Sequence, residues 1–192
     1  ADGAWPWTAA RPMPDIDLLV APSDRVAARD ALVAAGPTLE RSTPWEDSFL
    51  AWGDGGVGRT DGESADHNGK VEVHPGWVES IGPLFLDGTD ALFTRRRPGV
   101  LAGAPAHLLD PVALTAHVLG HLSSTVLRRE VRALNVVDLA LCLRALDDAE
   151  RGDLDALCAR LDPRFVVPGR WLLDAFGAAG SWRADGPHPN RF

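Results

Sequence analysis

The fold is decided by one short stretch of sequence, Asp15-Ile16-Asp17-Leu18-Leu19-Val20. It is rich in branched apolar residues and bounded by prolines, which is typical of a largely buried β-strand. Alternate side chains of a strand share a face, so Asp15 and Asp17 are expected to point one way and Ile16 the other. Two such carboxylates repel each other and lose hydration, and a divalent cation such as Mg²⁺ would offset both costs. The motif alone also fits a strand end with two hydrated carboxylates.

A second alternating run, Lys70-Val71-Glu72-Val73-His74, predicts another strand with a third carboxylate. Glu72 and His74 would share one face of this strand, and the two valines the other. If the strand lies beside the first one, the carboxylates of Asp15, Asp17 and Glu72 meet at one edge of the sheet. Three acids in one place can hold one or two divalent ions, so these residues are the candidate metal ligands and catalytic residues.

The sequence between these two runs continues the same pattern of short elements. A helix is expected over residues 22–35, with Gly36 in the position of a left-handed C-terminal cap. A weaker strand is expected over residues 48–52. Residues 53–69 are rich in Gly, Asp, Ser and Asn and predict a loop.

From Asp110-Pro111 onward the sequence becomes helical, because this pair suits an N-cap and a first turn. An apolar stripe at helical spacing then reaches Leu122. Further helices are expected over about residues 125–146, 153–161 and 168–176. Strands followed by a helical segment predict an α+β fold.

Two histidines and one aspartate lie on the apolar stripes of these helices. His117 and His121 are one turn apart, so they fit either a metal-binding pair or two core histidines held by hydrogen bonds. No glutamate follows His117 as in a His-Glu-x-x-His motif, which favours the second interpretation. Asp138 takes a core position, where a buried carboxylate needs a partner such as His117, His121 or Arg128. That pairing would present an imidazole or a guanidinium to a substrate.

The composition limits the partners and the compartment. The formal net charge is −8, whereas proteins that hold nucleic acid through its phosphates usually have a basic face, so polymeric nucleic acid is disfavoured. No stretch approaches the ~20 apolar residues that span a membrane, and no signal-peptide segment is present. Cys142 and Cys158 lie in apolar sequence and are expected to be buried free thiols. We therefore expect a cytoplasmic protein without a membrane partner.

Three stretches occur in an order that a known family shares. They are Arg11–Val20, with its Asp-x-Asp strand, then Glu72-Val73-His74, and then Arg132–Leu139 in the helical segment. In these stretches the chain resembles the nucleotidyltransferase superfamily typified by DNA polymerase β. It is most similar to the branch of uncharacterised nucleotidyltransferases, to which aminoglycoside and lincosamide nucleotidyltransferases are related. The resemblance covers roughly residues 3–145, and the Asp-x-Asp strand is its most specific part.

The resemblance implies a nucleotidyltransferase domain over residues 1–104, built on a small mixed β-sheet with flanking helices. It further implies a C-terminal helical domain over 105–180, followed by a tail over 181–192. The implied reaction moves a nucleoside monophosphate from an NTP to a hydroxyl or phosphate acceptor on a small molecule, peptide or protein.

The resemblance also implies roles for individual residues. Asp15 and Asp17 would hold Mg²⁺ or Mn²⁺, and Glu72 would assist a second ion or deprotonate the attacking hydroxyl. His74, together with the helical residues His117, His121 and Asp138, would contact the substrate or support the residues that do.

Triphosphate binding is where the sequence departs from the superfamily. Members place a Gly-Gly or Gly-Ser pair on a helix ahead of the first acids, whereas this chain offers Gly3-Ala4 there. Gly3, Ala4 and Arg11 are the candidate nucleotide-binding residues. The departure keeps open the alternative of a catalytically inactive, nucleotidyltransferase-like binding or interaction module.

Overall fold

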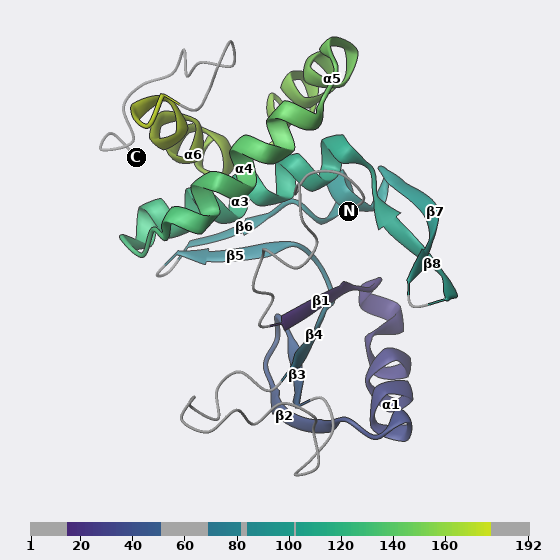
Figure 1. The fold of residues 1–192 in the computed structure, drawn as a ribbon. Helices are drawn as coiled ribbons and strands as arrows, with labels where there is room; N and C mark the ends of the chain where they lie inside the picture. The colour runs from purple at the N-terminus through teal and green to yellow at the C-terminus, as the bar shows by residue number, and fades with distance from the viewer. Residues whose placement is uncertain (1–14, 51–68, 82–83, 102, 178–192) are drawn as a thin grey trace, which may run out of the picture. The chain divides into compact units, whose positions relative to one another are not determined.

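A computed structural model of the chain describes residues 15–50, 69–81, 84–101 and 103–177 (Figure 1). It confirms the predicted α+β class, since a small mixed sheet is present and the C-terminal region is helical. The described residues form two compact units that divide between Trp77 and Val78. Each unit is described by itself below.

The first unit is built around a four-stranded sheet with the strand order β1-β4-β3-β2. Strand β1 pairs with β4 in parallel, while the β4–β3 and β3–β2 pairs are antiparallel, so the sheet is mixed as expected. The elements of this unit are β1 (Asp15–Leu19), the 3₁₀ turn η1 (Pro22–Asp24), α1 (Arg25–Ala35), β2 (Thr38–Ser42), β3 (Asp47–Leu50) and β4 (Lys70–His74).

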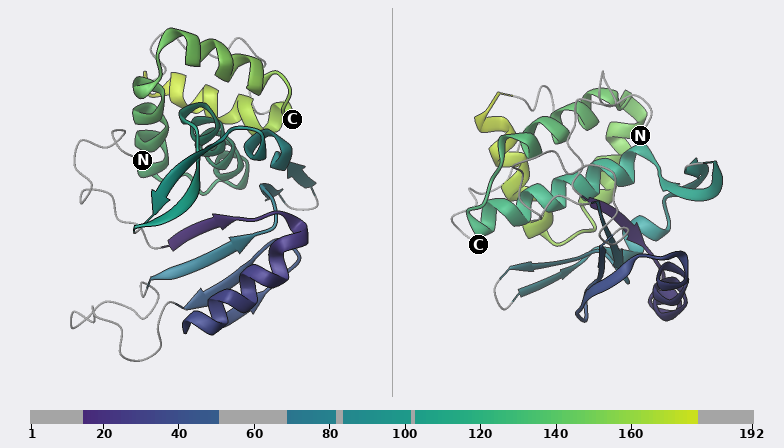
Figure 2. Two further views of the ribbon diagram at one scale, coloured as in Figure 1. Left: turned by 90° about the vertical axis from the view of Figure 1, so that its right-hand side faces the viewer. Right: turned by 60° about the horizontal axis from the view of Figure 1, so that its bottom comes forward.

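The two faces of this sheet differ in polarity because cross-strand partners share a face. One row across the sheet is polar and consists of Asp17, Glu72, Ser48 and Arg41. The neighbouring rows place apolar side chains on the opposite face, among them the fully buried Phe49 and Val73. Helix α1 contacts β4 and runs beside this sheet in both views of Figure 2.

A charged pair fixes α1 to the apolar face. Arg25 donates to both carboxylate oxygens of Asp47, at 2.8 and 2.7 Å, and also to the backbone oxygens of Thr43 and Pro44. Ser42 donates a further hydrogen bond to the same carboxylate. The partner of Arg25 therefore comes from a strand that lies 22 residues further along the chain.

The second unit consists of two hairpins and a helical bundle. The hairpins pair β5 (Val78–Ile81) with β6 (Leu84–Asp87), and β7 (Arg96–Leu101) with β8 (Ala104–Leu109). The helices are α2 (Thr89–Phe93), α3 (Pro111–Arg128), α4 (Ala133–Ala145), α5 (Asp148–Cys158) and α6 (Pro163–Ala175). Helix α3 packs against α4, α5, α6 and β5, so it is the centre of this unit. The expected burial of Cys142 and Cys158 is confirmed.

The predicted helix over residues 125–146 is wrong at its start. Helix α3 continues to Arg128, and Arg129 ends it with a left-handed backbone (φ 63°). Helix α4 begins only at Ala133, so Val131, which the predicted helix included, lies outside both helices and is 40% exposed.

The last predicted helix begins earlier than residue 168. Asp162 caps α6 by accepting from Arg164 N, and Pro163 fills the first turn, as Asp110 and Pro111 do for α3. Pro168 therefore lies inside the helix, where it cannot donate the usual backbone hydrogen bond. The helix predicted over 153–161 likewise begins earlier, behind the capping box of Asp147 and Glu150.

The sequence did not predict β2 or the two hairpins of the second unit. The expected domain boundary, between residues 104 and 105, falls in the β7–β8 hairpin, and the division into nucleotidyltransferase and helical domains stays a prediction. The predicted loop over 53–69, except its last residue, and the tail over 181–192 lie outside the described residues.

Candidate metal centre

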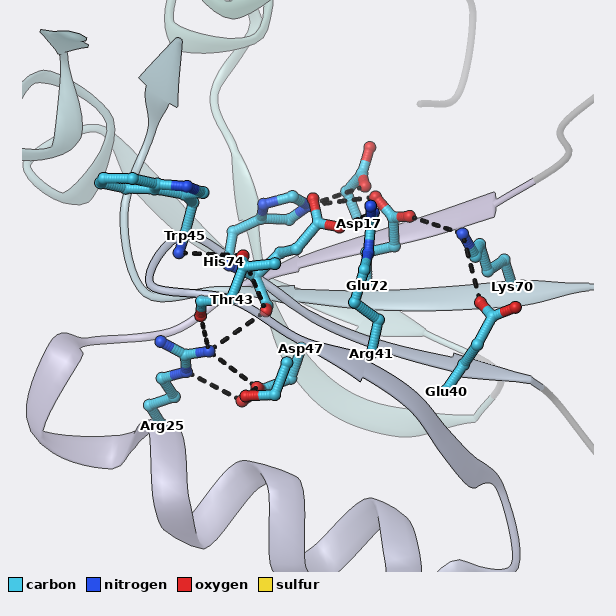
Figure 3. Close-up of polar contacts among 12 residues, drawn as sticks. Asp17, Arg25, Glu40, Arg41, Thr43, Trp45, Asp47, Lys70, Glu72 and His74 are labelled. Atoms are coloured by element: carbon cyan, nitrogen blue, oxygen red, sulfur yellow. Dashed lines mark hydrogen bonds and ion pairs between the residues drawn. The ribbon is translucent and has the colours of Figure 1, made fainter. Parts of the chain in front are cut away.

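Three side chains converge on the polar face of the sheet. In the parallel β1–β4 pair, Asp17 lies opposite Glu72, and Leu19 lies opposite His74. Glu72 and His74 are two residues apart on β4, so their side chains lie on the same face of the sheet. This is also the face of Asp17. One possible ligand atom from each of Asp17, Glu72 and His74 lies within 4.8 Å of the other two (Figure 3).

The imidazole of His74 lies against both carboxylates. Its Nε2 atom is 3.1 Å from Asp17 Oδ1 and 3.6 Å from Glu72 Oε2. Burial of the ring lowers the pKa of His74, but the hydrogen bonds and charges of Asp17 and Glu72 outweigh burial and raise it to about 10. The hydrogen bond from His74 in turn lowers the pKa of Glu72, against the opposing effects of burial and of the Asp17 charge. The protonated ring of His74 thus holds the carboxylates of Asp17 and Glu72 close together.

A second cation flanks the same glutamate. Lys70 is the only lysine of the chain, and its Nζ atom lies 3.4 Å from Glu72 Oε1 and 3.5 Å from Glu40 Oε2. Lys70 and Glu72 are two residues apart on β4, so their side chains lie on the same face of the sheet, as Figure 3 shows. This alternation was visible in the sequence, and the structure gives the residue a specific position beside the acidic cluster.

Ser48 is another residue that sequence reasoning missed. It lies opposite Glu72 in the antiparallel β3–β4 pair and is completely buried. Its hydroxyl has no hydrogen-bond partner in the part of the chain that the structure describes. No signal in the sequence distinguishes this serine, because its position depends on the β3–β4 register.

The expected triad is brought together in part. Asp17 and Glu72 meet, whereas Asp15 lies two rows along the sheet, opposite Lys70, and does not belong to the described group of three. His74 takes the third place in that group. The assignment of Asp15, Asp17 and Glu72 as metal ligands stays a prediction.

The second unit contains a separate buried carboxylate, that of Glu79 on β5. It lies 3.6 Å from His121 Nδ1 and 3.9 Å from Arg128 Nη1, two side chains of α3. Burial raises the pKa of Glu79, but hydrogen bonds from His121 and Ser124 and the charges of the α3 histidines lower it overall. The sequence suggested His121 and Arg128 as partners of Asp138. In the structure both side chains form ion pairs with Glu79.

Comparison with known proteins identifies the family. A family model described as uncharacterised nucleotidyltransferase matches residues 1–174. The chain belongs to this nucleotidyltransferase family. No curated protein matches the chain, and no solved structure matches it. The family membership supports a general role in nucleotidyl transfer, with an NTP as a substrate.

Nucleotidyltransferases generally use divalent metal ions, and the three clustered side chains fit such an ion. Carboxylate oxygens and imidazole nitrogens are ordinary ligands of divalent cations. The Asp17 side chain is 55% exposed, so it is accessible from solvent, whereas that of Glu72 is only 16% exposed. The donor set therefore combines one accessible and one sheltered carboxylate.

Other residues expected to act in this nucleotidyltransferase are not part of the cluster. Gly3, Ala4 and Arg11, the candidate nucleotide-binding residues, lie outside the described residues. His117 and the buried Asp138 belong to the second unit, on α3 and α4, and their contribution to a substrate site stays a prediction. Within the described residues, no helix is long and apolar enough to span a membrane.

Proposed function

We propose that the protein is a metal-dependent nucleotidyltransferase that moves a nucleoside monophosphate from an NTP to a hydroxyl or phosphate acceptor. The acceptor belongs to a small molecule, a peptide or a protein. One observation carries the proposal: Asp17, Glu72 and His74 gather within 4.8 Å on one sheet face of a chain in the nucleotidyltransferase family.

The side chains of this face would bind and orient the substrates. Asp17 and Glu72 would hold a divalent ion, and the exposed Asp17 would face the incoming triphosphate. Asp15, on the same face by strand alternation, would add a carboxylate nearby. Such an ion neutralises the charge that develops on the attacking and leaving oxygens. Lys70 and His74 restrain Glu72 from either side, so its carboxylate is held in position.

The transfer itself is an exchange at the α-phosphorus. The acceptor oxygen forms a bond to this phosphorus, the bond to the bridging oxygen of the β-phosphate breaks, and pyrophosphate leaves. The proton of a hydroxyl acceptor passes to a carboxylate of the cluster or to water. The net charge of −8 supports an acceptor other than a polynucleotide, because a polyanion would be repelled.

Thermal unfolding with ATP, GTP, CTP or UTP, each with and without Mg²⁺ or Mn²⁺, tests this proposal. A ligand at 100 times its Kd stabilises the folded state by about 2.7 kcal/mol, so binding raises the Tm. We expect a metal-dependent rise in wild type and in Asp30→Asn, an exposed aspartate on α1, but not in Asp17→Asn. Release of labelled pyrophosphate with a panel of acceptors then identifies the reaction. Failure of all four nucleotides to bind would refute the proposal.

A second candidate function is an inactive, nucleotidyltransferase-like binding module. It is favoured by one observation, namely that Lys70 and His74 already compensate the charge of Glu72 and Asp17 without any ion. Such a module would bind a nucleotide equally well with and without a divalent metal. It would release no pyrophosphate with any acceptor.

A further inference from the structure

We propose that His74 is a metal ligand, so that Asp17, Glu72 and His74, with Ser48 beside them, form a site for a single divalent cation that prefers Mn²⁺ to Mg²⁺. The inference deepens the proposed function, on which it rests for the role of the site. The resemblance to nucleotidyltransferases implies carboxylate ligands alone, so an imidazole ligand would be a feature of this chain.

The donor atoms already face one another. His74 Nε2 is the ring atom closest to the acids, at 3.1 Å from Asp17 Oδ1 and 3.6 Å from Glu72 Oε2. The three atoms that lie close together, one from each of Asp17, Glu72 and His74, are those that would share an ion. A divalent cation that binds here would release the Nε2 proton of His74 to solvent and take its place on that nitrogen, which points at the two carboxylates (Figure 3).

Ser48 is an independent indication of a ligand at this place. Its side chain is fully buried on the face of Glu72, directly across the β3–β4 pair, where Cβ atoms lie about 4.5–5.5 Å apart. Buried hydroxyl groups are nearly always hydrogen-bonded, yet this one has no partner within the described residues. A ligand bound beside Glu72 would give this hydroxyl the partner that it lacks.

Glu72 offers only one oxygen to the cation. Its Oε1 atom faces Lys70 at 3.4 Å, and its Oε2 atom faces His74. The ammonium group of Lys70 therefore occupies the side on which a second cation would have to bind. Because like charges repel, the cluster takes one ion.

The mixed donor set decides which ion is preferred. Mg²⁺ keeps its water molecules and selects oxygen ligands in octahedral geometry, whereas imidazole suits first-row transition metals. Mn²⁺ takes carboxylate and water ligands as Mg²⁺ does, but as the softer, first-row transition metal it accepts an imidazole nitrogen more readily. We expect Mn²⁺ to bind about tenfold more tightly than Mg²⁺, on the basis of this difference in ligand preference.

Manganese binding to the full chain, measured by electron paramagnetic resonance, tests the proposal without reference to activity. Titration with MnCl₂ gives the stoichiometry and the Kd, competition with MgCl₂ gives the preference, and pulsed measurements detect a nitrogen nucleus bonded to Mn²⁺. Wild type is expected to bind one Mn²⁺ with a nitrogen coupling. In His74→Gln the coupling disappears, and the preference for Mn²⁺ falls about tenfold.

Two further variants separate ligand loss from general damage. Ser48→Ala should weaken Mn²⁺ binding by about tenfold, as the loss of a group supporting a ligand does, but keep the nitrogen coupling. His107→Gln removes an exposed histidine on β8 and should change neither quantity. If wild-type Mn²⁺ shows no nitrogen coupling, or if Mg²⁺ binds equally well, the proposal is wrong, whether or not His74→Gln folds.

The outcome is separable from that of the proposed function. Nucleotidyl transfer with Mg²⁺ that survives in His74→Gln, without nitrogen coupling in wild type, would refute the ligand role and leave the transferase. Nitrogen-coupled Mn²⁺ in a chain that binds no nucleotide would support the site and refute the transferase.

Discussion

Lys70 and Glu72 form an ion pair on one face of β4, with Lys70 Nζ 3.4 Å from Glu72 Oε1. The pair lies beside the candidate cation site, so the ammonium group of Lys70 and a bound cation would compete for Glu72. The effect of this ion pair on metal binding can be measured, because replacing Lys70 leaves the possible ligands Asp17, Glu72 and His74 in place.

We predict that Lys70→Met binds divalent cations more tightly than wild type. Removal of a positive charge a few ångströms from the site lowers the repulsion of the cation, which should increase affinity on the order of tenfold. The free energy of unfolding without metal should fall by about 0.5–1 kcal/mol, since the pair is partly exposed. Calorimetric titration with MnCl₂ measures the first effect. Lys70→Arg keeps the charge and serves as the control, and weaker binding by Lys70→Met would contradict the prediction.

The strands that carry the site were predictable from alternation. The sequence predicted strands over residues 15–20 and 70–74, and the structure has Asp15–Leu19 and Lys70–His74. Their adjacency was the condition under which the carboxylates would meet, and β1 does pair with β4, with Asp17 opposite Glu72. Ser48 could not be predicted, because its place opposite Glu72 depends on the register of the β3–β4 pair.

Long-range partners explain the larger errors. Helical spacing describes a helix alone, and it therefore missed that Arg25 turns toward Asp47, 22 residues further along the chain. The start of α6 was missed for a different reason. Both Pro163 and Pro168 fit a first turn, and only the cap provided by Asp162 distinguishes them.

We predict that Arg25→Met strongly destabilises the first unit. Asp47 has no exposed surface, so loss of the guanidinium leaves a buried carboxylate without its main partner. Breaking such a pair costs about 3–5 kcal/mol. Urea unfolding followed by tryptophan fluorescence measures the change. Arg29→Met, which removes a pair with the exposed Asp30, should cost less than about 0.5 kcal/mol. Equal effects of the two substitutions would show that the buried pair has no special role.

The same pair makes stability depend on pH. The hydrogen bond from Arg25 lowers the pKa of Asp47, against the opposing effect of burial, so the folded-state pKa lies below the unfolded value of about 3.9. The stabilisation is fully present above the unfolded pKa and is lost as pH falls through the folded pKa. The difference in unfolding free energy between wild type and Arg25→Met should therefore stay constant from neutral pH down to about pH 4 and shrink below it. A difference that grows on acidification would contradict the assignment.

Gly169 allows the close approach of α6 to α3. A Cβ atom at this position would lie 2.8 Å from Leu119 Cδ1, 2.8 Å from Ser123 Oγ and 3.0 Å from the Leu119 backbone oxygen. We predict that Gly169→Ala lowers the free energy of unfolding by about 1–3 kcal/mol, the usual cost of overpacking. Gly152→Ala in α5 meets open space and should stabilise the protein by up to about 1 kcal/mol through helix propensity. Thermal unfolding distinguishes the two by the sign of the change in Tm.

Glu79 is expected to hold α3 against β5 through its charge. Glu79→Gln keeps the shape of the side chain but removes the negative charge that His121 and Arg128 share. Hydrogen bonds to charged groups contribute about 1.5–3 kcal/mol, so we predict a loss of that order at neutral pH. The loss should become smaller in acid, because the pKa of Glu79 is lowered on folding and its stabilisation fades as pH falls through the folded pKa. Glu130→Gln removes the exposed partner of Arg128 and should have almost no effect. If the two variants unfold at the same urea concentration, the contact of Glu79 with α3 does not stabilise this unit.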